Sequence, residues 1–445
     1  MERVASFSSR LEHSFRALRH RNFQLFVGGQ FISLIGTWMQ TVALGWLVYR
    51  LTHSPLLLGL TGFLGQIPSL VVSPLAGVLA DRWNRHRMVI ATQVFSMVQA
   101  TVLAILVLTH RITIGEILGL SLFIGLINAV DVPVRQSFLV EMVAGGEDLA
   151  NAIALNSSNF NVARLVGPAI AGVLIGLVGE GMVFLVNALS YLGVIGALLA
   201  IRVPPRSRPA QPPGMVWTNM KEGIRYVTGF APIRSVLLLL ALVSVFGSPY
   251  AVLMPVFARD VLHGDAHTLG FLVGAGGIGA LAGALYLAAR TTVKGLGRII
   301  VGAATAFGAG LCTFAMARNQ WIAAALLVVI GFGIMVHMAA TNTIIQTLVD
   351  PDKRGRVMSF YTVSFMGIAP LGSLTLGAIA SHIGAPWTVF LGGTVCIAGA
   401  LLFARRLPEL RRQVHPIYVR LGLVSGATEP EAPVSVAPPA EPFQE

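Results

Sequence analysis

Charged residues are scarce in this chain, and lysine is the scarcest of them. Asp, Glu, Lys and Arg make up 11% of the 445 residues, whereas soluble globular domains carry about 25%. None of the three lysines (Lys221, Lys294 and Lys353) precedes Ser or Thr, so the chain has no Walker A phosphate-binding loop. The H-E-x-x-H and G-x-S-x-G motifs of zinc proteases and serine hydrolases are also missing. We therefore expect a protein that is not an enzyme, with no metal site and no cofactor.

Cysteine is almost absent. The chain has only Cys312 and Cys396, and each lies in the middle of an apolar run. A free thiol in apolar surroundings behaves as a small hydrophobic residue. We therefore expect two free buried cysteines, with neither a disulfide nor a metal ligand.

Long apolar runs dominate the rest of the sequence. Hydrophobic residues make up 55% of the chain, and the mean hydropathy is +0.76. A helix of about 20 apolar residues crosses the roughly 30 Å hydrocarbon layer of a membrane. The first run exceeds the about 7–15 apolar residues of a signal peptide, so it is interpreted as a retained span. The runs predict twelve transmembrane helices, at residues 23–49, 56–80, 88–109, 114–135, 152–178, 182–201, 235–258, 267–289, 298–317, 321–345, 356–380 and 386–404.

The basic residues are distributed unevenly over the predicted loops. With the N-terminus in the cytoplasm, the inner loops and tails contain 26 of the 31 Lys and Arg residues, and the outer loops contain 4. An excess of basic residues marks the cytoplasmic side. We therefore expect a multi-pass protein of the bacterial plasma (inner) membrane with both termini in the cytoplasm. The net charge of +12 then reflects topology, and no nucleic-acid partner is expected.

The longest predicted inner connection, residues 202–234, separates six spans from six. It begins with proline-rich sequence, which excludes a helix, and continues with an amphipathic segment at residues 216–227. Matching glycines also indicate two related halves, at offsets of 211 and 205: Gly36 with Gly247, Gly59 with Gly270, and Gly172 with Gly377. We predict an N-terminal six-helix half at 1–202, a cytoplasmic linker at 203–234, a C-terminal six-helix half at 235–406 and a largely disordered cytoplasmic tail at 407–445.

A short charged segment separates the second apolar run from the third. Its sequence is GVLADRWNRHR at residues 77–87, and no charged residue occurs in the flanking stretches 56–80 and 88–109. The pattern G-x-x-x-D-R-x-x-R-x-R resembles the signature loop between helices two and three of the major facilitator superfamily of transporters. The alternative interpretation is an ordinary basic cytoplasmic loop.

The fifth run contains a second element that resembles this superfamily. Gly167, Pro168 and Gly172 are similar to the glycine-proline element that marks span five in the superfamily's exporters. Proline removes a helix hydrogen bond and glycine lets helices approach closely, so we predict a kink and a tight helix contact here.

Three smaller matches narrow the resemblance to one branch of the superfamily. Residues 22–23, 135–136 and 355–357 look like the branch that contains the enterobactin exporter and macrolide-efflux proteins. The resemblance covers about residues 19–406. It implies the major facilitator fold, an all-α membrane protein with twelve transmembrane helices in two pseudo-symmetric six-helix halves.

The resemblance also implies a function. We expect a secondary active transporter, an antiporter that exports an amphipathic small molecule of drug or siderophore type by proton-coupled alternating access. Its partners would be the substrate, protons and the lipid bilayer, and it would act as a monomer. In the family the acid equivalent to Asp81 bridges helices two and eleven, and helix eleven begins here near Arg356. Gating roles are thus implied for Gly77, Asp81, Arg82, Arg85, Arg87, Gly167, Pro168, Gly172 and Arg356.

Polar residues within the first span form one stripe. They recur at helical spacing on an otherwise apolar helix: Gln30, Ser33, Thr37, Gln40 and Thr41. Such residues are costly in hydrocarbon unless they face water or a partner. The functional interpretation is the wall of a substrate cavity, and the structural alternative is hydrogen bonding between helices.

The fourth span contains an acid, Asp131, near its cytoplasmic end. Asn128, Asp131 and Arg135 lie on one helix face, so Asp131 and Arg135 are close enough to pair. Asp131 is the leading candidate for the proton carrier, and Asn128 and Arg135 for the substrate cavity. A structural ion pair at the cytoplasmic mouth is the equally weighted alternative.

Two further ionisable residues lie within spans. Arg164 in span five shares a stripe with Asn156 and Phe160, and an arginine at mid-membrane should face the cavity, an acid such as Asp131 or an anionic substrate group. We assign Asn156 and Arg164 to the substrate cavity. His337 in span ten is a second candidate for proton coupling, although a lone histidine in a helical bundle is more often only hydrogen-bonded.

Two other functional classes remain open at this point. A mover of lysophospholipids or other lipids would share the fold but need a lateral opening. A non-transporting membrane receptor or regulator would keep the fold and lose the polar residues within the spans. The presence of Asp131, Arg164 and the stripe in span one argues against the receptor.

Overall fold

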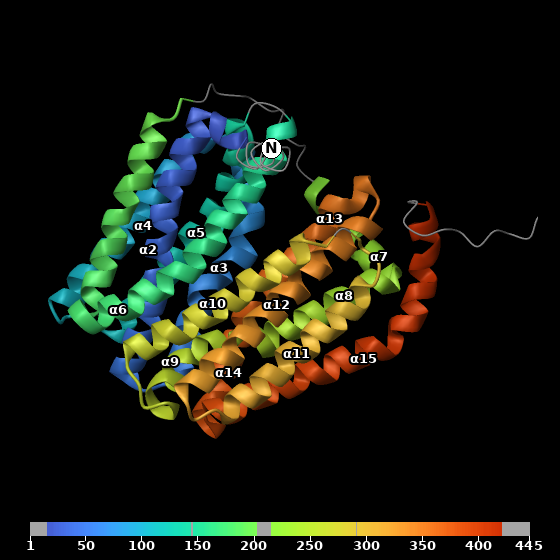
Figure 1. The fold of residues 1–445 in the computed structure, drawn as a ribbon. Helices are drawn as coiled ribbons and strands as arrows, with labels where there is room; N and C mark the ends of the chain where they lie inside the picture. Colours follow the sequence, from blue (N-terminus) through green and yellow to red (C-terminus); the bar gives the residue numbers. More distant parts are fainter. Residues whose placement is uncertain (1–15, 144–145, 203–214, 291, 421–445) are drawn as a thin grey trace, which may run out of the picture.

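The computed structural model of the chain describes residues 16–143, 146–202, 215–290 and 292–420, without the side chains at 74–75, 77–82, 146–147, 215–221 and 351–352. Helices make up the first half of the described chain: η1 (Arg16–Arg19), α2 (Arg21–Thr52), α3 (Pro55–Arg82), α4 (Arg85–Leu108), α5 (Ile114–Met142) and α6 (Gly146–Ala200). Figure 1 shows them as one group of long helices on the left.

The second half is also helical. It follows the amphipathic helix α7 (Met215–Gly229), which covers the segment predicted at 216–227. Its elements are α8 (Ala231–Leu242), η2 (Val243–Gly247), η3 (Ser248–Leu253), α9 (Met254–Val256), η4 (Phe257–Val261), α10 (Ala266–Ala288), α11 (Leu296–Met316), α12 (Gln320–Leu348), α13 (Pro351–Thr362), η5 (Val363–Gly367), α14 (Ala369–Ile383) and α15 (Ala385–Arg420).

Twelve apolar segments long enough to cross a membrane lie within these described residues. Eleven continuous helical stretches meet the length and hydropathy required, and one of them, Asp148–Ala200, contains two spans. Gly179 divides that stretch, because its φ of 80° and ψ of 170° are not helical, and only glycine adopts such a conformation without strain. The predicted fold class is confirmed.

Spans seven and eleven are irregular, and spans four and twelve differ from the prediction at their ends. Span seven includes Pro249 and Pro255, whose missing N–H groups interrupt the helix and leave short 3₁₀ and π turns. Helix α5 continues to Met142 and α15 to Arg420, beyond the predicted ends at residues 135 and 404. Residues 407–420, which the sequence analysis places in the tail, are therefore helical.

The two halves pack their first and last spans in the same way. A Cβ atom on Gly36 of span one would lie 2.4 Å from Asn187 in span six. A Cβ on the matching Gly247 of span seven would lie 2.9 Å from Cys396 in span twelve. Both distances are below those of real Cβ contacts, so each glycine lets two helices meet where a larger residue would separate them.

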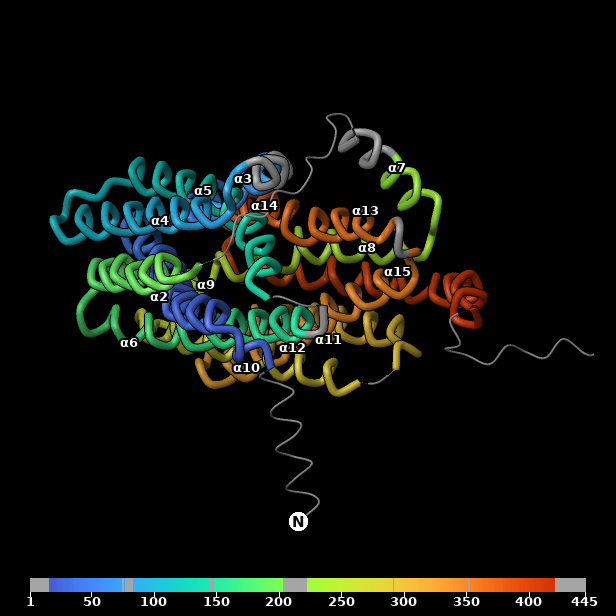
Figure 2. Tube along the Cα trace, turned by 90° about the horizontal axis from the view of Figure 1, so that it is seen from above, coloured from blue at the N-terminus to red at the C-terminus, as the bar shows by residue number. Residues whose placement is uncertain are grey.

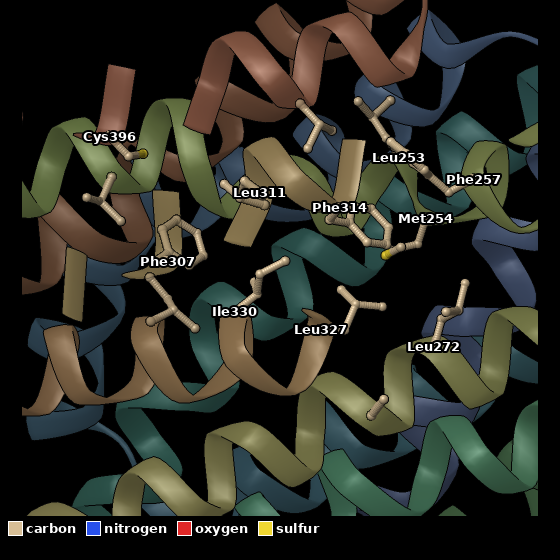
Figure 3. Packing of buried hydrophobic residues seen from close by; sticks show 14 of the residues in the cluster. Leu253, Met254, Phe257, Leu272, Phe307, Leu311, Phe314, Leu327, Ile330 and Cys396 are labelled. Carbon is tan, nitrogen blue, oxygen red and sulfur yellow. The ribbon is translucent and has the colours of Figure 1, made fainter. Parts of the chain in front are cut away.

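The apolar core of the second half lies between α8, α11, α12 and α15. The ring centres of Phe257 and Phe314 lie 4.6 Å apart with the rings tilted by 37°, and Phe307 and Leu311 face Ile330 of α12 (Figure 3). Both cysteines are free thiols. Cys396 is buried in this cluster, as the sequence predicts, whereas Cys312 is only half-buried.

Candidate functional site

A cavity of about 540 Å³ lies between the two halves. Its walls come from α2, α3, α4, α5 and α6 on one side and from η3, α9 and α10 on the other. Every polar residue of the predicted stripe in span one lines it: Gln30, Ser33, Thr37, Gln40 and Thr41. Asn128, Asp131 and Arg135 of α5 line the same cavity.

Asp131 is the centre of a polar cluster on the wall formed by the first half. Its side chain is buried, and its carboxylate accepts hydrogen bonds from Thr92 Oγ1 at 2.7 Å and Gln93 Nε2 at 2.8 Å. Arg135 Nε lies 3.1 Å from the other carboxylate oxygen, so the predicted pairing of Asp131 with Arg135 is confirmed. Because burying a carboxylate is costly unless it is paired and hydrogen-bonded, these three donors offset the cost of burying Asp131.

A chain of buried amides crosses the first half beside this cluster. Gln40 of α2 donates to Gln99 of α4 at 3.0 Å and accepts from Asn187 of α6 at 2.7 Å. Gln99 also lies 3.5 Å from the Leu120 carbonyl of α5. Four helices are thereby linked through fully buried polar groups, which favours movement of this half as one body. Gln40 thus forms hydrogen bonds between helices as well as lining the cavity.

The wall contributed by the second half is apolar. Its lining residues carry no polar side chain: Ala251, Val252, Met254, Pro255, Leu269 and Val273. The cavity therefore has one polar, ionisable wall and one apolar wall. An amphipathic molecule can satisfy both walls at once, whereas a uniformly polar solute would leave groups unpaired against the second half.

Two crossings of glycines close the cavity at one end of the bundle. A Cβ on Gly172 would lie 2.9 Å from the Cα of Gly270, and a Cβ on Gly377 would lie 2.9 Å from the Cα of Gly59. These are glycines that the sequence matches between the halves, so span five crosses span eight as span eleven crosses span two. Figure 2 shows the second crossing as α14 beside α3.

A hydrogen bond joins the halves at the same end. The Tyr49 hydroxyl of α2 donates to the Asp260 carboxylate of η4. This end also contains Gly179 and the connection between α14 and α15, and the predicted topology places it outside the cell. We call it the outer end and the opposite one the inner end.

The halves diverge toward the inner end, where η1, α7 and α13 lie (Figure 1). The following ion pairs each stay within one half or join it to the linker. Arg85 Nη1 lies 2.6 Å from Glu141, and Arg16 Nε lies 2.7 Å from Asp148, which also bonds His20. Arg356 of α13 pairs with Glu222 of α7, and Lys353 lies over the Tyr226 ring at 5.3 Å. Among the described residues, contacts between the halves therefore gather at the outer end while the helix backbones diverge at the inner end, an arrangement that we call inner-open.

Comparison with known proteins identifies this architecture. Residues 12–418 match the family of transmembrane secretion effectors, a branch of the major facilitator superfamily. The chain belongs to this family. It is a membrane transporter and not an enzyme, as the sequence predicts.

Several curated transporters resemble this one along most of their length. The staphyloferrin A transporter of Staphylococcus aureus is 25% identical over 391 residues, covering 87% of this chain and 97% of the relative. The multidrug efflux pump Tap of Mycolicibacterium fortuitum is 24% identical, covering 84% of this chain and 93% of the pump. Macrolide efflux protein A of Streptococcus pyogenes is 23% identical, with coverages of 83% and 92%.

Solved structures support the fold. A POT family transporter in complex with a thioalcohol-conjugated peptide superposes with a TM-score of 0.70 at 12% identity, covering 88% of this chain and 96% of that one. A bacterial homologue of the human lysosomal transporter Spinster gives 0.63 at 16% identity, with coverages of 89% and 97%.

Not every predicted site residue of the transporter reaches the cavity. Arg164 and Asn156 are half-buried on α6 and lie outside the cavity lining. The guanidinium of Arg164 lies 5.7 Å from the centre of the Trp38 ring, and Trp38 does line the cavity. Within the described chain Asp131 pairs with Arg135 rather than with Arg164. Among the described residues Arg164 thus contacts the cavity lining through Trp38.

His337 is fully buried within the second half and is not among the residues that line the cavity. Neither of its ring nitrogens has a hydrogen-bond partner among the described residues, and the same is true of the Thr341 hydroxyl one turn later. Among the described residues His337 therefore has no contact with the Asp131 cluster. Its role as a proton relay stays a prediction.

The predicted gating residues fall into two groups. The side chains of Gly77, Asp81 and Arg82 lie outside the described residues. Arg87 lies in the first turn of α4, where its N–H donates to the side chain of the N-cap residue Asn84 at 3.1 Å. Gly167 and Pro168 lie where α6 meets other helices, since a Cβ on Gly167 would be 2.6 Å from the Cβ of Trp38.

The sequence analysis missed most of the partners of Asp131 and Gln40. One region of α4 carries four polar residues that were not predicted: Thr92, Gln93, Ser96 and Gln99. Thr92 and Gln93 donate hydrogen bonds to Asp131, and Gln93 and Ser96 line the cavity. Their spacing resembles the stripe in span one, so the rule that identified Gln30 and Thr37 would have found them. Asn187 gave a weaker signal, because only Ser190 and Tyr191 accompany it on one face of its span.

Proposed function

We propose that this transporter exports an amphipathic small molecule in exchange for protons, by alternating between the inner-open state described above and an outer-open state. The observation that carries the proposal is the two-sided cavity, in which an ionisable, hydrogen-bonded Asp131 faces an apolar wall. The proposal places both termini in the cytoplasm of a bacterium, so that the open end faces the cell interior.

The cavity supports a substrate with separate polar and apolar parts. Gln30 Oε1 is buried and has no hydrogen-bond partner among the described residues, which leaves an acceptor for a hydroxyl or amine of the substrate. The apolar body would lie against Met254, Leu269 and Val273. Small pockets of a few hundred cubic ångströms commonly combine apolar walls with few polar groups in this way.

Asp131 supports the exchange of substrate against a proton. While ionised, its carboxylate holds Arg135 and the α4 donors in place. Protonation would remove the charge, release Arg135 and change the polar wall that a substrate meets. A carboxylate can be protonated or can make the interaction that favours the substrate, but it cannot do both at once. Such a group couples the flux of protons to the flux of substrate.

Closure of the inner end completes the proposed cycle. Asp81 ends α3 and would meet the start of α13 near Arg356 when the halves close there. In the inner-open structure Arg356 pairs with Glu222 instead. Export thus requires Arg356 to exchange a partner on the linker for one on the other half.

The relatives support this direction of transport and this kind of substrate. Two of them are described as efflux proteins for drugs or macrolides, and one as a transporter of a siderophore, staphyloferrin A. We propose a cargo of drug or siderophore type here.

The experiment that tests the function uses everted membrane vesicles from a host lacking its own efflux pumps. A macrolide, a lipophilic cation and a carboxylate siderophore are each offered, with the vesicle interior made acidic. The proposal expects uptake of at least one compound, lost when a protonophore collapses the gradient. Uptake that persists without the gradient would contradict proton coupling, and a lysophospholipid as the sole transported compound would favour the lipid mover.

A further inference from the structure

A second cavity of about 330 Å³ lies inside the second half, at its inner end. It is enclosed by the starts of α8 and α11, the end of α12 and the last turns of α15, and none of its lining residues belongs to the main cavity. It therefore plays no part in the transport path described above.

The extension of α15 beyond the membrane forms one wall of this cavity. Its apolar residues recur three or four positions apart and so share one helix face: Phe403, Leu407, Leu410, Val414 and Tyr418. Helix α15 changes direction in this region, near the internal Pro408, before its last turns (Figure 1). Leu410 and Val414 are only 6% and 8% exposed, although they follow the predicted end of the span. The opposite wall is aliphatic as well, with Val236, Ile344 and Leu348.

The polar groups of the cavity are basic. Lys294, Arg411 and His415 line it, and its lining contains no Asp or Glu. Within the described chain neither Lys294 nor Arg411 forms an ion pair. Lys294 and Arg411 are both exposed to solvent. Two permanent cations thus border the mouth of an apolar cavity without a counter-charge from its lining, and both would attract an anionic group placed there.

We propose that this cavity binds an anionic phospholipid of the inner leaflet, with an acyl chain against the aliphatic walls and the phosphate between Lys294 and Arg411. All four bordering elements end on the side that carries the basic loops, so the cavity lies at headgroup depth. Leu401 and Leu402, which precede the cavity on α15, are 53% and 61% exposed, as expected of residues that contact hydrocarbon. A bound lipid would tie the α15 extension to α11 and α12.

The experiment measures lipid binding to the purified full-length protein in detergent by native mass spectrometry, with phosphatidylglycerol and phosphatidylcholine as probes. The charge variant is Lys294→Gln/Arg411→Gln. Its matched control is Arg405→Gln/Arg412→Gln, which removes two exposed cations of α15 that do not line the cavity. We expect phosphatidylglycerol to bind about tenfold more weakly to the charge variant, because each basic residue near a membrane surface adds a separate attraction. The control should bind it as the wild type does.

Two further variants identify the occupant. Val414→Trp fills the cavity and keeps both charges, so it should also weaken phosphatidylglycerol binding. Truncation after Arg420 removes Glu429, Glu431, Glu441 and Glu445, and it should leave lipid binding unchanged. Equal losses in the two charge variants, or no preference over phosphatidylcholine, would overturn the proposal. Stronger binding after truncation would show that the chain's own acidic tail occupies the cavity. No step of this test depends on transport.

Discussion

The two ends of the transporter are built on different physical principles. At the outer end the halves meet backbone to backbone, at Gly172 with Gly270 and at Gly59 with Gly377. At the inner end, charged side chains such as Arg85 and Glu141 pair within their own half. The outer end is thus closed by the tight packing of helices at their glycines. At the inner end these charged side chains have partners within one half, so the halves can stay apart without leaving them unpaired.

This difference indicates what each conformational change requires. Opening the outer end separates surfaces that fit closely, and the loss of many short contacts is spread over two helix crossings. Closing the inner end requires ion pairs to exchange partners, at a cost set by how well the new pairs form. Substitutions at the outer end should therefore alter the conformational change by changing side-chain volume. Substitutions at the inner end should alter it by changing side-chain charge.

Among the variants that compare the two ends, the largest effect is expected from widening one glycine crossing. Gly172→Leu places a side chain where only 2.9 Å separates its Cβ from the Gly270 backbone. Overpacking costs about 1–3 kcal/mol, so the closed outer end should become about tenfold less populated and export should fall accordingly. Labelling of Thr41→Cys by an impermeant maleimide from outside, with Cys312 and Cys396 replaced by alanine, would measure the outer-open fraction.

Gly176→Leu is the matched control for that variant. Gly176 lies one turn further along α6, and a Cβ there meets nothing within 4 Å. Labelling and export in this variant should equal those of the wild type. If both leucine variants behave alike, the crossing does not close the outer end.

A smaller effect is expected from removing charge at the inner end. Asp81→Asn should reduce transport by up to about tenfold, the value of one charge-assisted hydrogen bond, and leave equilibrium substrate binding intact. Asp350→Asn is the control, since Asp350 lies at the same end but pairs with Lys353 and Arg420 of its own half. Loss of substrate binding with normal closure of the inner end would place Asp81 in the binding site instead.

The hydrogen bond between Tyr49 and Asp260 allows a finer comparison within the outer end. Tyr49→Phe keeps the ring and removes the donor. A net loss of about 1 kcal/mol predicts a roughly fivefold rise in the outer-open fraction, less than the glycine variant gives. The same maleimide assay measures it. A change as large as that of Gly172→Leu would mean that the polar contact, and not the glycine fit, closes this end.

The smallest effect is expected at Arg164 and concerns the preference for anionic over cationic substrates. Arg164→Lys keeps the charge but weakens the contact with Trp38, which is worth about 0.5–1 kcal/mol. Export of an anionic compound should fall about threefold relative to a cationic one, and further in Arg164→Gln. Paired export assays at matched expression measure the ratio. Equal losses for both compounds would make Arg164 a structural residue.

The sequence predicts those parts of this architecture that depend on local spacing. The spans follow from the length of their apolar runs, and the Asp131–Arg135 pair follows from a separation of four residues on one helix. Gly172 and Gly270 are visible as matching glycines, but their contact depends on how two distant helices cross. Thr92 and Gln93 reach Asp131 from another helix, so spacing along the chain could not pair them.

Two other features could not be predicted from the sequence, each for a different physical reason. The sequence predicts that span twelve ends at residue 404, just before Arg405 and Arg406, yet α15 continues because its apolar face packs against the second half in place of lipid. The open inner end could not be inferred at all, since one sequence encodes every state of an alternating cycle and no residue pattern selects one of them.

The central claim, that Asp131 carries the exchanged proton, has a direct test in proteoliposomes loaded with a compound identified in the vesicle assays. One experiment drives efflux with an imposed pH gradient, and the other follows exchange of labelled for unlabelled compound at equal pH. Glu116→Gln is the control, because Glu116 lies on the same helix in an N-terminal capping box that glutamine can maintain. Asp131→Asn should abolish gradient-driven efflux and retain exchange, since an amide mimics only the protonated carboxyl group. Undiminished gradient-driven efflux in Asp131→Asn would contradict the account.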